Sequence, residues 1–216
     1  MPHARSHSRA PGDLLFRFRL ALLLHRLKRL HALPPGATVE LKPVLFAALL
    51  NHFGNKGPAE IPIKRRWTYR WCTWWAKELG IPFRFPASHP FNPLHHLRLA
   101  IAAGVTREAV SRIFDAVWTT GAEATEPRAF AALAKSLGVD EARLAAPEVK
   151  DALRRNTEEA IARGVFGVPS YEADGEIFWG ADAIGFVNAF LADPAALRND
   201  EIHRADGLPV GAARKA

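Results

Sequence analysis

Residues 164–183 read GVFGVPSYEADGEIFWGADA, and the fold is decided in this stretch. The pattern over 168–179 predicts two short apolar strands, because the Asp174-Gly175 pair between them favours a tight hairpin turn. The Val168-Pro169 bond stands directly before the first strand, where we expect the cis form of proline. The residues from Gly180 onward begin the last helix. The stretch therefore predicts a hairpin that is entered through proline and closed by a helix.

Upstream of the hairpin, the chain predicts a short β-α-β unit followed by helices. Alternating apolar residues indicate strands over 14–18 and 39–45, and helical apolar spacing falls over 20–30 between them. A β-α-β start, a late hairpin and a closing helix follow one another in this order in thioredoxin-like folds. The long segment between the two halves is helical. We therefore expect an α/β protein with a thioredoxin-like fold and an inserted all-helical domain.

The predicted elements divide the chain into four parts. The thioredoxin-like domain is discontinuous, over 14–46 and 164–198, and the inserted helical domain takes 47–163. Residues 1–13 are expected to form a disordered or aberrant N-terminal arm. Residues 199–216 lose helical periodicity, which predicts a loosely ordered tail.

The composition excludes several classes of protein. Cys72 is the only cysteine among 216 residues, so the chain has no disulfide framework, no thiolate zinc cluster and no Cys-x-x-Cys redox pair. His95-His96 has no acidic or cysteine partner at ligand spacing, so no metal site is expected. No apolar run approaches the roughly 20 residues of a membrane span.

The net charge of +7 comes almost entirely from the first 31 residues. Residues 1–31 hold seven Lys or Arg and one acidic residue, whereas the remainder holds 22 and 21. The body of the protein is therefore close to neutral and no nucleic-acid partner is expected, with a DNA-binding arm as an alternative. The longest apolar run of the arm is too short for a signal peptide, which favours a cytoplasmic protein over a targeted one.

A basic and aromatic helix is predicted over 62–79. Lys64, Arg65 and Arg66 occupy its first turn, where the helix dipole disfavours cations, so an anion-binding site is one interpretation. A Lys64 stem packed on tryptophan, with its ammonium in water, is the other. Lys64 shares a face with four tryptophans, which predicts packing in the core of the insertion rather than an aromatic ligand site. They are Trp67, Trp71, Trp74 and Trp75.

Three further segments carry candidate ligand-binding residues. Asn55 lies in a polar, glycine-punctuated loop over 51–58, at the predicted junction of the two domains, where pockets tend to form. Asp182 stands at the start of the last helix, and its carboxylate either caps that helix or binds a ligand ammonium. The backbone at Val168, beside Pro169, is expected to pair with an extended peptide.

Six motifs follow one another along the chain. They are GNKGP at 54–58, PxK at 62–64, GIPFRFP at 80–86, HPFN at 89–92, VFGVP at 165–169 and WGAD at 179–182. In this order they resemble the bacterial 2-hydroxychromene-2-carboxylate isomerases, which are relatives of kappa-class glutathione transferases in the DsbA-like thioredoxin superfamily. The resemblance runs from about residue 25 to residue 191. It implies that glutathione is held between the thioredoxin-like domain and the inserted helical domain, and that the protein is a homodimer.

The resemblance also implies a role for each candidate residue. Asn55 and Lys64 would lie by the glutathione thiol and the substrate, and the Val168 backbone beside Pro169 would pair with the peptide portion. The implied activity is isomerisation of a chromene carboxylate, a small aromatic carboxylate, to a benzylidenepyruvate during aromatic hydrocarbon breakdown. The residues implied to hold the γ-glutamyl end are Gly180, Ala181 and Asp182.

The resemblance fails at one place. The family's first strand carries a Ser-Pro pair whose serine hydroxyl activates the glutathione sulfur, whereas residues 15–22 read LFRFRLAL. No catalytic residue is therefore identifiable from Leu15 to Leu22, although Arg17 or Arg19 could lower a thiol pKa by its charge. The codons for 16–21, read one nucleotide later, can spell FDFVSP, so a frameshift is one hypothesis for the break.

Two other functions stay open beside the isomerase. A kappa-like glutathione transferase acting on other electrophiles would share every motif. A catalytically silent glutathione-binding protein would lack only the activating serine. The single cysteine argues against a DsbA-type oxidoreductase.

Overall fold

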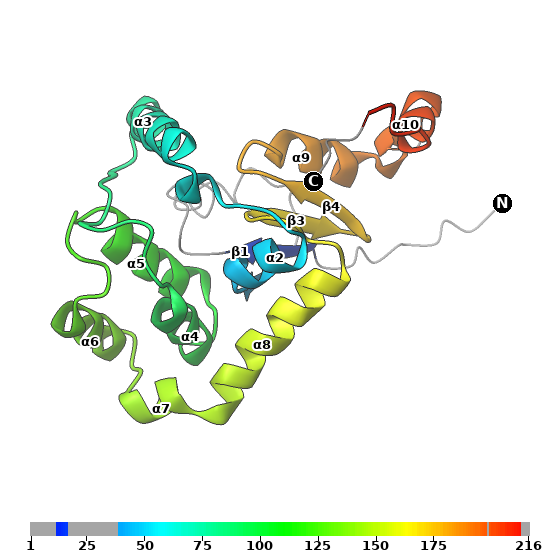
Figure 1. Ribbon diagram of the computed structural model, residues 1–216. Helices are drawn as coiled ribbons and strands as arrows, with labels where there is room; N and C mark the ends of the chain where they lie inside the picture. The colour runs from blue at the N-terminus through cyan, green and yellow to red at the C-terminus, as the bar shows by residue number, and fades with distance from the viewer. Residues whose placement is uncertain (1–11, 17–38, 198, 213–216) are drawn as a thin grey trace.

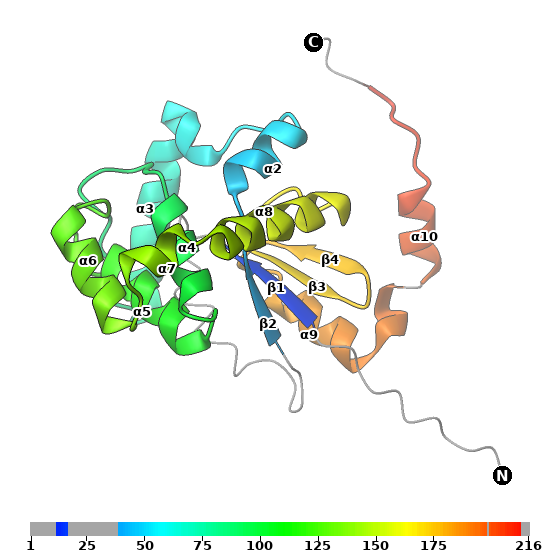
Figure 2. The same ribbon diagram turned by 90° about the horizontal axis from the view of Figure 1, so that it is seen from below.

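The computed structural model describes residues 12–16, 39–197 and 199–212, and places a small sheet between helices (Figures 1 and 2). The strand order is β2-β1-β3-β4. The central β1 (Gly12–Phe16) runs parallel to β2 (Val39–Pro43) and antiparallel to β3 (Ser170–Ala173). β3 and β4 (Glu176–Trp179) form the predicted hairpin, with Asp174 and Gly175 in the turn at positive φ. This is the thioredoxin-like arrangement that the sequence predicts.

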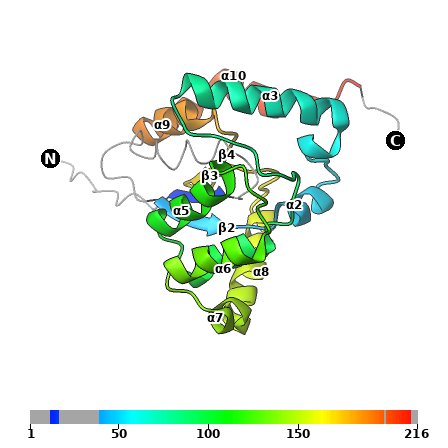
Figure 3. The ribbon, with the colours of Figure 1, turned by 90° about the vertical axis from the view of Figure 1, so that its left-hand side faces the viewer.

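The helices begin where the sequence supplies a cap or a proline. Thr106 accepts a hydrogen bond from the Ala109 amide at 3.1 Å, and Pro127 and Pro147 take first helical positions. The inserted helices α3 to α7 lie beside the sheet (Figures 1 and 3). The helical elements are α2 (Phe46–His52), η2 (Pro58–Glu60), α3 (Pro62–Glu78), α4 (Leu94–Ala102), α5 (Arg107–Trp118), α6 (Pro127–Ser136), α7 (Glu141–Ala145), α8 (Pro147–Ala162), α9 (Ile184–Ala192), η3 (Pro194–Leu197) and α10 (Asp200–Asp206).

One hydrophobic core joins the inserted helices to the sheet. Trp118 at the end of α5 is fully buried, with the rings of Phe83 and Phe85 centred 6.0 and 5.8 Å from its own. The same cluster of buried side chains contains Tyr171 of β3 and Phe178 of β4. The insertion and the sheet therefore depend on each other for burial of apolar surface.

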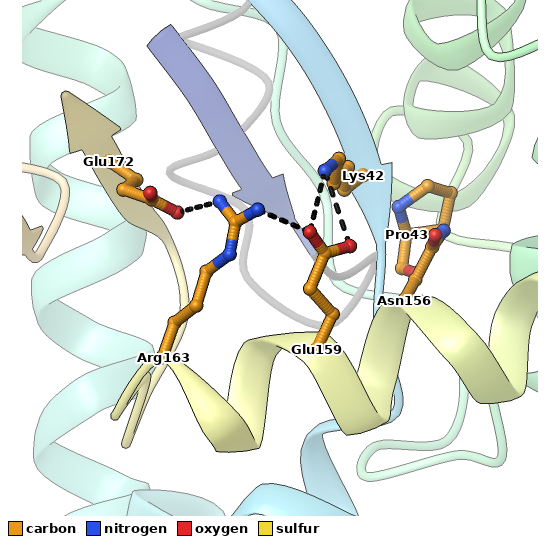
Figure 4. A network of polar contacts seen from close by, with 6 residues as sticks. All are labelled: Lys42, Pro43, Asn156, Glu159, Arg163 and Glu172. Carbon is orange, nitrogen blue, oxygen red and sulfur yellow. Dashed lines mark hydrogen bonds and ion pairs between the residues drawn. The ribbon is translucent and has the colours of Figure 1, made fainter. Parts of the chain in front are cut away.

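Polar contacts join helix α8 to strands β2 and β3 (Figure 4). Glu159 accepts from Lys42 of β2, with Nζ and Oε2 3.3 Å apart, and also pairs with Arg163, which in turn pairs with Glu172 of β3. The amide of Asn156 donates to the Pro43 carbonyl at 3.2 Å. We call this set of contacts the α8 clamp. Through it α8, which the predicted boundary at 163 assigns to the insertion, also packs on the sheet.

The sequence prediction places some boundaries differently from the structure. β1 covers 12–16 rather than 14–18, so Gly12 and Asp13 belong to the central strand and not to the N-terminal arm. The helix predicted over 20–30 and most of the segment Leu15–Leu22 lie outside the described residues. The predicted loose tail contains α10, whose first turn is capped by Asn199 accepting from the Ile202 amide at 3.0 Å.

The tryptophan face of α3 is not packed as the sequence predicts. Trp67 is 63% exposed and Trp74 is 56% exposed, so the prediction that the stripe packs in the core is wrong for both. α3 turns Cys72 and Ala76 inward instead, a face that is rotated from the stripe. Lys64, predicted to share a buried face with the stripe, is exposed.

Candidate functional site

The loop before β3 presents free backbone. The Val168-Pro169 bond is cis, as expected, and the Pro169 carbonyl accepts from the Gly180 amide at 3.0 Å. The Val168 amide and carbonyl make no hydrogen bond with any residue that the structure describes. The register pairs Leu15 of β1 with Ser170, so the C-terminal end of β1 arrives beside this loop. An extended peptide could therefore add to the backbone at Val168.

Two aromatic side chains, Phe166 and Trp179, flank the same loop as a pair that the sequence pattern does not predict. A Cβ at Gly167 would overlap the indole nitrogen of Trp179, so only glycine lets the loop approach that ring. Trp179 is 57% exposed, and its ring is centred 5.2 Å from that of Phe166. The signal in the sequence is the glycine between two large apolar residues, Phe166 and Val168.

Asp182 is not a helix cap. α9 begins at Ile184 with Ala183 at its N-cap position, and no side chain caps the helix. The Asp182 carboxylate is exposed and makes no hydrogen bond or ion pair with the described part of the chain. It folds back over Gly180, where φ is +108° and an added Cβ would lie 2.5 Å from Oδ1. The capping interpretation is therefore wrong, and the carboxylate is available to a ligand.

Helix α3 meets the turn between β4 and α9 at a buried contact. Cys72 and Ala181 form a small apolar cluster against Trp71 and Trp75. Burial raises the pKa of the Cys72 thiol to about 12, so the thiol stays protonated at neutral pH. The cysteine therefore serves packing rather than redox chemistry.

The other two candidate residues lie in neighbouring segments, Asn55 in the loop after α2 and Lys64 in the first turn of α3. Asn55 is exposed in the loop after α2, where its backbone N–H donates to the Leu50 carbonyl at 2.8 Å. Leu49, also in α2, belongs to an apolar cluster against which Val168 packs, which links this loop to the hairpin. The first turn of α3, with Lys64, contains no acidic residue.

Two packing contacts link the candidate segments in pairs. The Asn55 loop approaches Val168 through α2, and α3 reaches Ala181 through Cys72. The described residues contain no cluster of side chains suited to a metal ion. Nor does any helix in the described ranges combine the length and apolarity needed to cross a bilayer. The groups available to a ligand are the Val168 backbone, the Asp182 carboxylate and the exposed cations of α3, with exposed aromatic side chains in the same segments.

Comparison with known families identifies the class of protein. The DsbA-like thioredoxin domain matches residues 21–192, so the chain belongs to the DsbA-like thioredoxin family.

Two sequence relatives and one solved structure show which members of this family the chain resembles. The chain is 31% identical over 178 residues to glutathione S-transferase kappa 2 of Caenorhabditis elegans, covering 72% of this chain and 79% of that protein. It is 27% identical over 165 residues to a 2-hydroxychromene-2-carboxylate isomerase of Sphingobium xenophagum, covering 73% and 85%. A solved structure of 2-hydroxychromene-2-carboxylate isomerase has a TM-score of 0.73 at 24% identity and covers 89% of this chain and 99% of that chain. The family resemblance and the thioredoxin-like fold are both confirmed.

Proposed function

We propose that the protein is a glutathione-dependent isomerase of the 2-hydroxychromene-2-carboxylate type. Two observations carry the proposal: among the residues that the structure describes, the Val168 backbone has no hydrogen-bond partner, and the Asp182 carboxylate neither caps a helix nor meets a cation. Free peptide groups and an uncommitted carboxylate match the peptide bonds and the ammonium of a γ-glutamyl peptide. The proposal includes a homodimer, as the resemblance implies, and a cytoplasmic location, which the short apolar run within residues 1–31 favours.

The spacing of Lys64 and Cys72 along α3 is comparable with the length of a tripeptide. Lys64 precedes Cys72, which contacts Ala181, by eight residues, or about 12 Å along a helix axis. Three extended residues span about 10 Å. In the proposal Gly180, Ala181 and Asp182 hold the γ-glutamyl end, and the Val168 backbone beside Pro169 holds the peptide portion. Asn55 and Lys64 then lie near the thiol and the substrate.

The residues of this chain would orient both reactants. Bound glutathione would supply a thiolate that adds reversibly to a conjugated double bond and so permits rotation about it. Lys64 would attract an anionic substrate and favour a nearby thiolate by its charge. Trp179 and Phe166 would cover the aromatic body of the substrate from the loop side. The serine that activates the sulfur in the family has no counterpart in 15–22.

Asp182→Asn is expected to weaken glutathione binding about 10- to 100-fold, because a charge-assisted hydrogen bond contributes about 1.5–3 kcal/mol. Isothermal titration calorimetry with glutathione measures the effect. Asp174→Asn is the matched control: it makes the same change at the exposed far turn of the hairpin, where asparagine tolerates the positive φ of 51°. Equal affinities for the two variants would contradict the site.

Lys64→Met separates the isomerase from a transferase. We expect kcat/KM for a chromene carboxylate to fall about 10-fold, since one cation facing a carboxylate contributes on the order of 1 kcal/mol. Turnover of an uncharged aryl halide should fall less. Lys77→Met, at the other end of α3, removes an exposed lysine as control. Equal losses with both substrates, together with faster turnover of the aryl halide, would favour a kappa-like glutathione transferase on other electrophiles.

A catalytically silent glutathione-binding protein is the second candidate, and the missing Ser-Pro pair favours it. The double variant Leu20→Ser and Ala21→Pro restores the pair. A rise in turnover of 100-fold or more would show that the unmodified chain only binds glutathione. Unchanged turnover, above background, would show that the present residues suffice for catalysis.

A further inference from the structure

A cavity lies among the inserted helices, away from the residues proposed to bind glutathione. It has a volume of about 880 Å³ and is formed by α4, α6, α7 and the first turns of α8. Figure 3 shows α6 and α7 at the opposite end of the molecule from α3. None of the proposed glutathione residues lines it. The volume is within the range of sites for small organic ligands.

The wall of this cavity is apolar and partly aromatic. The ring of Phe130 is centred 5.8 Å from that of His95 and 5.3 Å from that of His96, edge to face in both cases. Burial, with the charge of nearby His95 adding to it, lowers the pKa of His96 to about 4, so its imidazole is neutral at pH 7. The other apolar side chains along the wall are Ala131, Ala134, Val139, Leu144 and Ala145.

The polar groups of the cavity favour an anion. Arg98, Lys135 and Lys150 line it, and none of the three forms an ion pair within the described ranges. The Nε–H of Arg98 is buried without an acceptor among those residues, which is costly unless a ligand supplies one. Of the two acidic residues in the lining, Asp140 already accepts from the Arg143 amide at 2.7 Å to cap α7. Glu141 is the other, and it is exposed.

We propose that this cavity is a second binding site for a small organic monoanion with a planar aromatic body, separate from the glutathione site. The aromatic body packs against Phe130 and the neutral His96. The anionic group accepts from Arg98, with Lys135 and Lys150 adding charge at the rim. The site is independent of the proposed function, because it shares no residue with the glutathione region.

Calorimetry with biphenyl-4-carboxylate tests the proposal, with biphenyl-4-methanol as the uncharged analogue. We expect the carboxylate to bind with a Kd below about 1 mM, as its size allows. Ala131→Trp fills the cavity from an exposed position on α6 and should abolish binding. Ala132→Trp adds the same side chain to the neighbouring exposed position, which does not line the cavity, and should leave Kd unchanged.

The Arg98→Met variant tests how much the charge of Arg98 contributes to binding. It should weaken binding of the carboxylate about 10-fold or more while binding of the alcohol stays the same. Saturating glutathione and Asp182→Asn should change neither affinity. Absence of binding to the unmodified protein, equal affinities for Ala131→Trp and Ala132→Trp, or displacement of the carboxylate by glutathione would overturn the proposal. Matching unfolding midpoints of the two tryptophan variants confirm that both are folded.

Discussion

Replacing Trp118 with alanine is expected to lower the free energy of unfolding by about 3–5 kcal/mol, the usual cost of removing a buried large aromatic side chain. Trp118 has no exposed surface, and its ring meets those of Phe83, Phe85, His89 and Phe91 at centroid distances of 5.6–6.3 Å. Removing the indole would leave a cavity between α5 and the segment before α4, where these aromatic rings pack against one another. Urea unfolding followed by circular dichroism measures the change.

Trp74→Ala is the matched control for this variant. The same side chain is removed from α3, but Trp74 is 56% exposed, so the expected loss is about 1 kcal/mol or less. Comparable losses for the two variants would contradict the exposed position of the outer face of α3.

Acid is expected to destabilise the protein through His96, by about 3 kcal/mol in total. Burial holds the pKa of this histidine at about 4, below its ordinary value of 6.5. Between these two pH values the unfolded chain binds a proton that the folded chain does not. The contribution to stability is therefore complete above pH 6.5 and is lost as the pH falls toward 4.

His96→Leu removes this titration and should flatten the fall of stability with acid. Urea unfolding at pH 7, 5.5 and 4.5 gives the free energies for the variant and the unmodified protein. His95→Gln, on the exposed neighbouring position, should retain most of the slope of the unmodified protein, because burial is the larger cause of the lowered His96 pKa. A His96→Leu variant that loses as much stability in acid as the unmodified protein would contradict the buried neutral imidazole.

Local chemistry made much of the fold predictable. Asp174-Gly175 favours a hairpin turn, and Thr106, Pro127 and Pro147 are residue types that favour helix starts, which is where they lie. The placement of the tryptophans on α3 was not predictable in the same way. Helical periodicity shows which side chains share a face, but only tertiary packing decides which face turns inward, and here it is that of Cys72 and Ala76.

The candidate site was predictable where a residue's role depends on the backbone around it. Val168 and Pro169 followed from the entry to the hairpin, and the cis bond is present. The capping role of Asp182 was wrong because the N-cap position of α9 is Ala183, one residue later, a shift that sequence cannot resolve. Trp179 was missed because its proximity to Gly167 is a contact between separate strand ends, set by the sheet register.

The α8 clamp has a consequence for how this fold changes over evolutionary time. It ties the strands on both sides of β1 to one helix, through Lys42, Glu159, Arg163 and Glu172. The place of the central strand is therefore held by its neighbours. Selection can then act on the sequence of β1 and on its chemistry while the architecture persists. A lineage of this kind can exchange residues of its central strand and still inherit an intact scaffold.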